Sequence, residues 1–139
     1  MEKIKLLIVE DSKLDQKFLD HSLSESIFEK RLAENGTKAL KVYEDWKPDI
    51  ILLDLMLPEM SGYNVLRAIR NKHEDQSTTI IIASALSDSE DIRQCAKYGI
   101  QGYLVKPIKP KELDKTILKL HGNSNPVKSA QIAPFMQNL

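Results

Sequence analysis

Five short apolar runs that alternate with segments of helical periodicity restrict the fold of this chain more than any other feature. The runs span residues 4–9, 28–33, 50–53, 80–83 and 102–105. They are brief and rich in Ile, Leu and Val, which is typical of strands buried on both faces of a sheet. Lys30 and Arg31 interrupt the second run, so we expect this strand at an edge of the sheet.

Apolar residues at helical spacing predict a helix after each run. These residues are Leu14, Phe18, Leu19 and Leu23; Ala39, Leu40, Tyr43 and Trp46; Val65, Leu66 and Ile69; Ile92, Cys95 and Ala96; and Leu113, Ile117 and Leu120. We expect Pro48 to stop the second helix, and Gly99 and Gly122 to end the fourth and fifth. The Ser-x-x-Glu pattern from Ser87 to Glu90 predicts that the fourth helix begins there. The prediction is an α/β fold, a doubly wound parallel sheet of five strands with helices on both faces.

The end of the chain falls outside this alternation. The length of 139 residues fits a single domain, which we expect over residues 1–122. Residues 123–139 carry Pro126, Ser129 and Pro134. Apolar residues at helical spacing (Ile132, Phe135, Met136 and Leu139) favour a docking helix as the alternative, but Pro134 lies inside it. We therefore expect a flexible tail.

Composition excludes several classes of function. Lys and Arg number 20 and Asp and Glu number 20, so the formal net charge is +0, and we expect no direct binding to nucleic acid. No apolar run approaches the roughly 20 residues that span a bilayer, so we expect no membrane insertion. The single cysteine and the lack of a long apolar segment after Met1 are typical of a cytoplasmic protein.

Acidic residues follow the first and third predicted strands where each strand ends. Glu10 and Asp11 follow the first strand, and Asp54 follows the third. Ligands of parallel sheets bind at the carboxyl ends of the strands, so we expect these three carboxylates at one edge. Their mutual repulsion must be relieved by protonation or by a cation. Because the set offers only oxygen ligands, we expect it to bind Mg²⁺.

A hydroxyl and an ammonium follow the remaining central strands. Ser84 ends the fourth predicted strand and Lys106 follows the fifth. Taken singly, Asp54 could be a turn or cap residue, Ser84 an ordinary strand-end serine and Lys106 a solvated lysine. Because all of them fall at carboxyl ends of separate strands, we favour one site. An acid cluster with a lysine and a hydroxyl suits a phosphoryl group bridged by Mg²⁺.

At these residues the chain resembles the receiver domain of two-component response regulators. The resemblance covers about residues 3–121. It rests on residues 7–12 (LIVEDS), 49–58 (DIILLDLMLP), 61–62 (SG), 82–85 (IASA) and 102–107 (GYLVKP). It implies a flavodoxin-like strand order of 2-1-3-4-5 and a signalling domain that is a phosphoacceptor rather than an enzyme.

The resemblance also implies roles for the acidic residues. Asp54 would take a phosphoryl group from a sensor histidine kinase or a phosphotransfer protein. Asp11 would bind Mg²⁺ directly and Glu10 through a bound water. Asp54 and the backbone carbonyl of Met56 would complete the protein ligands.

Further roles follow for the residues that respond to phosphorylation. Lys106 would pair with the phosphoryl oxygens, Ser84 would bond to the phosphate, and Tyr103 would turn inward. The signal would be a population shift on the face built from the fourth helix, fifth strand and fifth helix. The partner of that face would be a downstream protein target or an output domain on a longer chain, and both remain open. Lys106–Pro107 is a candidate for a cis peptide bond.

Other residues receive plainer interpretations. Met56 and Leu86 flank the expected phosphate and are apolar, which predicts slow to intermediate self-dephosphorylation. His21, His73 and His121 are separated in sequence and have no ligand partner at metal spacing, so we expect exposed histidines. We expect Cys95 in the core.

Two other functions are compatible with parts of this pattern. A Mg²⁺-dependent phosphatase with an aspartate nucleophile would share the sheet and Asp54. Such hydrolases usually carry a second acid two residues after the nucleophile, where this chain has Met56. A receiver-like module that binds partners without phosphorylation is the other alternative. The set of Glu10, Asp11, Asp54, Ser84 and Lys106 argues against it.

Overall fold

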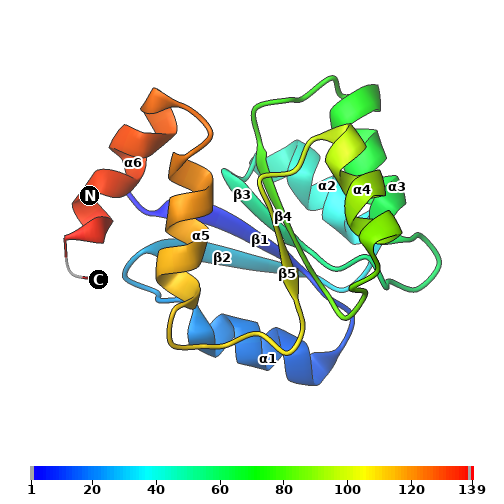
Figure 1. Ribbon diagram of the computed structural model, residues 1–139, viewed down its shortest axis with the longest axis horizontal. Helices are drawn as coiled ribbons and strands as arrows, with labels where there is room; N and C mark the ends of the chain where they lie inside the picture. The colour runs from blue at the N-terminus through cyan, green and yellow to red at the C-terminus, as the bar shows by residue number, and fades with distance from the viewer. Residues whose placement is uncertain (1, 138) are drawn as a thin grey trace.

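A parallel sheet of five strands forms the centre of the computed structural model, which describes residues 2–137 and 139 (Figure 1). The strands are β1 (Ile4–Val9), β2 (Phe28–Ala33), β3 (Ile50–Leu53), β4 (Thr79–Ser84) and β5 (Gly102–Val105). Their order is β2-β1-β3-β4-β5, with every neighbouring pair parallel. The predicted fold class and strand order are confirmed, and β2 lies at an edge as expected.

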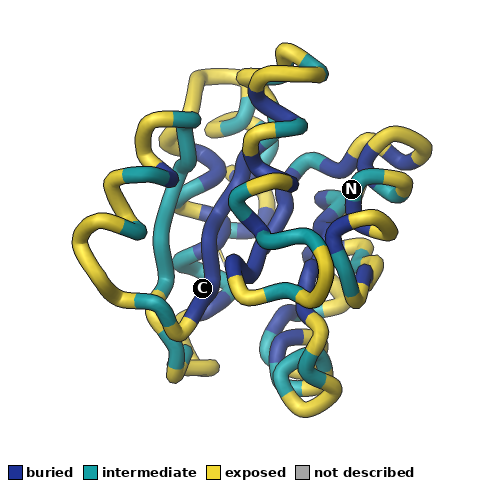
Figure 2. The backbone as a smooth tube through the Cα atoms, turned by 90° about the vertical axis from the view of Figure 1, so that its right-hand side faces the viewer, coloured by how far each residue is buried: buried dark blue, intermediate teal, exposed yellow. Residues whose placement is uncertain are grey.

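Helices cover both faces of the sheet (Figure 1). They are α1 (Lys13–Ser22), α2 (Gly36–Trp46), α3 (Gly62–Arg67) with its π-helical continuation η1 (Ala68–Lys72), α4 (Ser89–Tyr98), α5 (Leu113–Gly122) and α6 (Pro126–Met136). Apolar residues of α1, α5 and α6 pack in one core cluster, and those of α2, α3 and α4 pack in the other. The central strands β1, β3 and β4 are buried, and the exposed residues lie on the helices, the loops and the edge strands (Figure 2). No helix in the described part of the chain is long and apolar enough to cross a bilayer.

Helix α4 begins one residue later than the capping-box pattern predicts. The N-cap is Asp88, whose carboxylate accepts a hydrogen bond from the Glu90 backbone N–H at 3.0 Å. The prediction that placed the cap at Ser87 was therefore wrong, because the adjacent acid satisfies the free N–H instead. Gly99 ends the helix with φ of +92°, as expected. Cys95 is fully buried on this helix, which confirms it as a core residue.

Residues 126–136 form a helix, so the expectation of a flexible tail was wrong for this segment. The Asn125 side chain caps its first turn, and Pro126 occupies a first-turn position where the missing N–H costs nothing. Ile132 and Phe135 are buried in the same core cluster as residues of α5. Pro134 removes one intrahelical bond, but the burial of these two side chains outweighs that loss.

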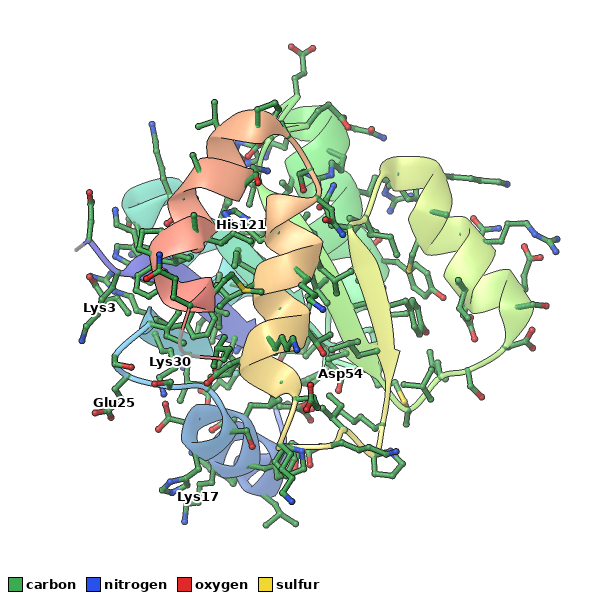
Figure 3. The ribbon with its side chains drawn as sticks, turned by 60° about the vertical axis from the view of Figure 1, so that its left-hand side comes forward. Lys3, Lys17, Glu25, Lys30, Asp54 and His121 are labelled. Carbon is green, nitrogen blue, oxygen red and sulfur yellow. The ribbon has the colours of Figure 1, made fainter. Side chains whose placement is uncertain are left out.

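His121 connects α6 to the sheet, in contrast to the exposed position predicted for it. Its side chain is 1% exposed and lies between α5 and α6 (Figure 3). Its Nδ1 lies 2.7 Å from the Thr79 hydroxyl, and its Nε2 lies 2.7 Å from Oε1 of Gln131. Sequence reasoning missed this burial because Gln131 lies in the segment expected to be flexible. His21 is exposed as expected, whereas His73 is only partly exposed and lies beside Glu44.

The contacts of His121 favour the neutral form of its imidazole ring over the protonated form. Lys128 donates to the Thr79 hydroxyl, which leaves that hydroxyl free to donate to Nδ1. Burial lowers the pKa of His121, and the positive charge of Lys128 acts in the same direction. The folded protein therefore takes up a proton at His121 less readily than the unfolded chain does.

This difference predicts a pH-dependent contribution of His121 to stability. It is fully present above the ordinary histidine pKa of 6.5 and is lost as the pH falls below it, because the unfolded chain gains the proton first. The difference in unfolding free energy between wild type and His121→Gln should narrow between pH 7.5 and pH 5.5, measured by urea denaturation. His21→Gln, at an exposed histidine, is the control. An equal His121→Gln effect at both pH values would contradict the interpretation.

Candidate functional site

The predicted site residues converge at the carboxyl edge of the sheet. Glu10 and Asp11 follow β1. Asp54, labelled in Figure 3, follows β3. One oxygen atom from each of these carboxylates lies within 4.8 Å of the others. Glu10 and Asp54 are buried, whereas Asp11 is exposed. The parallel topology thus brings Asp54 to Glu10 and Asp11, which precede it in the sequence by more than 40 residues.

Lys106 places its ammonium group among the carboxylates. Its Nζ lies 2.5 Å from Oε1 of Glu10, 2.9 Å from Oδ2 of Asp54 and 2.8 Å from Oδ2 of Asp15. Burial lowers the pKa of Lys106, but the hydrogen bonds to the three carboxylates outweigh it, and the pKa is raised overall. The side chain is therefore a permanent positive charge at this edge.

Glu10 is the most strongly perturbed acid of the cluster. Burial raises the pKa of Glu10 to about 7, and the nearby charge of Asp54 adds to this rise. Hydrogen bonds from Lys106 and from the Ser12 backbone N–H oppose it. A buried carboxyl beside like charges is destabilised in its ionised form unless a cation lies close.

The acid cluster fits a hard divalent cation. It supplies carboxylate oxygens only, and exposed Asp11 leaves room for water ligands. Mg²⁺ favours this combination of a few carboxylates and several waters. The cluster of Glu10, Asp11 and Asp54 is the one group of this kind found among the described residues.

The two oxygens of Asp54 have different partners. Oδ1 accepts the Met56 backbone N–H at 3.0 Å, and Oδ2 accepts from Lys106. Met56 is 55% exposed, and Leu86, two residues after Ser84, is half-buried. Both side chains are apolar, so neither can bind a water molecule near Asp54.

Ser84 and Tyr103 both contact the backbone of Leu86. The buried Ser84 hydroxyl accepts the Leu86 N–H at 3.3 Å, and the Tyr103 hydroxyl donates to the Leu86 carbonyl at 2.7 Å. Burial raises the pKa of Tyr103 to about 12. The loop between β4 and α4 is therefore held from two strands at a single residue.

Two backbone features shape the loops around the site. The Lys106–Pro107 peptide bond is cis, as expected. Gly62 donates its N–H to the Leu55 carbonyl at 3.0 Å, so α3 begins close to the loop that follows β3. A Cβ at Gly62 would lie 2.3 Å from the Asp54 carbonyl oxygen.

Two contacts of the site were not predicted from the sequence. Asp15 binds Lys106, and the Gln16 side chain donates to the Glu10 carbonyl at 2.6 Å. Both lie in the first turns of α1. The Ser12-x-x-Asp15 spacing is typical of a helix cap, so it carried no signal for a role in the site.

Comparisons with known proteins agree with this geometry. The family model described as the response regulator receiver domain matches residues 6–118. The DNA-binding response regulator MtrA of Mycobacterium tuberculosis is 35% identical over 109 residues, which are 78% of this chain and 46% of MtrA. For ycf27 of Guillardia theta, the identity is 36% over 115 residues, 83% of this chain and 44% of that protein. The chain thus spans about half the length of the curated relatives it matches.

Comparison with solved structures agrees with the match to this family. Chemotaxis protein CheY4 of Vibrio cholerae superposes with a TM-score of 0.78 at 28% identity, covering 86% of this chain and 99% of CheY4. The receiver domain of the Francisella response regulator 1452 also has a TM-score of 0.78 at 28% identity, covering 88% of this chain and all of that chain.

The close approach at Gly62 predicts a large effect of a single methyl group. Gly62→Ala should lower the free energy of unfolding by about 1–3 kcal/mol, because the Cβ meets backbone atoms that cannot move aside. Urea denaturation measures this loss. Gly36→Ala is a matched control at the first residue of α2, where the Cβ meets side-chain atoms of Met60 and Val65 rather than backbone atoms. Equal losses for the two variants would contradict the argument.

Proposed function

The chain belongs to the response regulator receiver domain family, and we propose that it accepts a phosphoryl group on the Asp54 carboxylate in a Mg²⁺-dependent reaction. The observation that carries this proposal is the convergence of the Glu10, Asp11 and Asp54 carboxylates, with the Lys106 ammonium bound to Glu10 and Asp54. The donor is a phosphohistidine of a sensor histidine kinase or of a phosphotransfer protein. The Asp54 carboxylate forms the new bond to phosphorus while the nitrogen–phosphorus bond of the donor breaks.

The proposed role of each site residue follows from the position of its side chain. Asp11 and Asp54, with the Met56 carbonyl, would hold Mg²⁺ directly, and Glu10 would hold it through a water. Bound there, Mg²⁺ supplies neutralisation of charge on the phosphoryl oxygens. Lys106 lies 2.9 Å from Asp54 and is placed to donate to a phosphoryl oxygen. The chain is thus a phosphoacceptor that assists its own phosphorylation and dephosphorylation, rather than an enzyme with a separate substrate.

The proposed signal passes through the backbone of Leu86. A phosphoryl group on Asp54 offers the Ser84 O–H a strong acceptor, and rotation of the side chain toward it withdraws Oγ from the Leu86 N–H. A shift of this loop breaks the bond from Tyr103 to the Leu86 carbonyl and frees that ring to turn inward. The α4-β5-α5 face would then favour a second conformation, as a population shift.

The proposed partners follow from the family. The donor would be a cytoplasmic kinase or phosphotransfer protein, and the α4-β5-α5 face would bind a downstream protein or an output domain. MtrA is described as DNA-binding and is about twice as long as the matched region, so a function on DNA is not assigned to this domain.

Phosphorylation by a small donor tests the proposal. Incubation with acetyl phosphate and Mg²⁺ should add the mass of one phosphoryl group, measured by intact mass spectrometry. The gain should disappear without Mg²⁺ and in Asp54→Asn, because the reaction needs both the cation and the nucleophile.

The alternatives predict other outcomes of this experiment. Continuous turnover of a generic phosphomonoester would favour a phosphatase over a phosphoacceptor. A lack of phosphorylation from both acetyl phosphate and a phosphorylated kinase would favour a phosphorylation-independent binding module.

The apolar side chains of Met56 and Leu86 predict slow to intermediate dephosphorylation of Asp54. Met56→Asn or Leu86→Glu should raise the first-order rate of dephosphorylation several-fold, because a polar side chain there can orient the attacking water. Loss of the phosphoryl mass with time measures the rate. Val127→Asn, at an exposed site on α6, is the control. An unchanged rate in both site variants would contradict this account of the lifetime.

A further inference from the structure

We propose that Asp15 is a positioning residue that holds Lys106 in the unphosphorylated protein and releases it when a phosphoryl donor reaches Asp54. The inference rests on the proposed function and adds to it a competitor for the Lys106 ammonium. Asp15 lies in the first turn of α1, outside the acid cluster that fits the cation.

All hydrogen-bond donors of Lys106 are engaged in this conformation. An ammonium group has three N–H donors. Those of Lys106 are matched by Glu10, Asp15 and Asp54, with Nζ···O distances of 2.5, 2.8 and 2.9 Å. A phosphoryl oxygen can therefore gain a bond from Lys106 only if one of these carboxylates gives up its own.

The carboxylate of Asp15 is available because a neighbouring acid takes over its usual role. In a capping box, the acid three residues after the cap accepts the N–H of the cap residue. Here the Ser12 N–H donates to Oε2 of Glu10 instead, at 3.1 Å. The Ser12 hydroxyl still accepts the Asp15 N–H at 3.3 Å, which fixes the backbone of Asp15 at the start of α1. The Asp15 side chain is left to bind Lys106.

The surroundings of Lys106 make Asp15 its polar partner on the α1 side. Asp15 and Lys106 line a cavity of about 150 Å³. The other lining residues are Phe18, Leu19, Pro107 and Ile108, whose side chains offer no hydrogen-bond acceptor. Without the Asp15 carboxylate, the ammonium would face apolar walls on this side.

The exposed fraction of each carboxylate determines which of them Lys106 leaves in exchange for a phosphoryl oxygen. The side chains of Glu10 and Asp54 are 2% and 6% exposed, whereas that of Asp15 is 38% exposed. While the phosphoryl donor approaches, Asp54 is still an ionised carboxylate. A carboxylate released into water is hydrated at once, but a buried one, Glu10 or Asp54, is left without compensation. Asp15 is therefore the partner that Lys106 leaves at the lowest cost when a phosphoryl oxygen arrives.

The competition has a kinetic consequence. Asp15→Asn weakens the hold on Lys106 and removes a negative charge that repels the anionic donor. With Mg²⁺ saturating, the rate of phosphorylation by acetyl phosphate should rise about two- to five-fold, the range expected for a partly exposed ion pair. Asp20→Asn is the matched control, because Asp20 lies on the same helix but pairs with Lys30.

A second measurement tests the ion pair between Asp15 and Lys106 in the absence of a metal ion and of a phosphoryl donor. The unfolding free energy is measured in urea with a chelator for wild type, Asp15→Asn, Lys106→Met and the double variant. Asp15→Asn should destabilise the protein that has Lys106, because it loses the ion pair. It should not destabilise Lys106→Met, where the same change only relieves repulsion among carboxylates. An equal effect in both backgrounds would mean that Asp15 acts independently of Lys106 and would overturn the inference.

The two experiments distinguish a failure of this inference from a failure of the proposed function. Wild-type protein that is phosphorylated at the same rate as both Asp15→Asn and Asp20→Asn would overturn the role of Asp15 alone. Wild-type protein that takes up no phosphoryl group from acetyl phosphate or a kinase would overturn the proposed function, whatever the stability measurements give.

Discussion

The site depends on one ammonium group that balances several carboxylates at the edge of a parallel sheet. The topology brings Glu10 and Asp54 together at the ends of adjacent strands, where burial makes their repulsion costly. Lys106 reaches them from an edge strand, and its bonds to both acids join β1, β3 and β5. A second cation at the acid cluster would complete this balance.

Much of this arrangement can be predicted from the sequence because its signals are local. Strand bounds follow from short apolar runs, and four of the five predicted strands match the structure at both ends. Asp54, Lys106 and Ser84 could be placed at one edge because chain direction alone brings the ends of parallel strands together. The periodicity also identified Cys95 as a core residue.

The remainder depends on partners that are distant in the sequence. His121 is buried because Thr79 and Gln131 satisfy its ring, and helix α6 that supplies Gln131 carries a proline that favours a tail in a local analysis. Asp15 matches a helix cap by spacing, and only the path of Glu10 and Lys106 in three dimensions gives it another role. Local patterns therefore locate elements, whereas competition between nearby polar groups decides which of them pair.

The burial of Cys95 has a practical consequence for observing the domain. It is the one cysteine of the chain, its side chain is fully inaccessible, and burial raises the pKa of its thiol to about 11. A thiol that is both shielded and protonated reacts slowly with maleimides. A cysteine introduced on the outer surface of α4 or α5 would therefore take a fluorophore or spin label selectively, and the motion of that face could be followed in an otherwise natural chain.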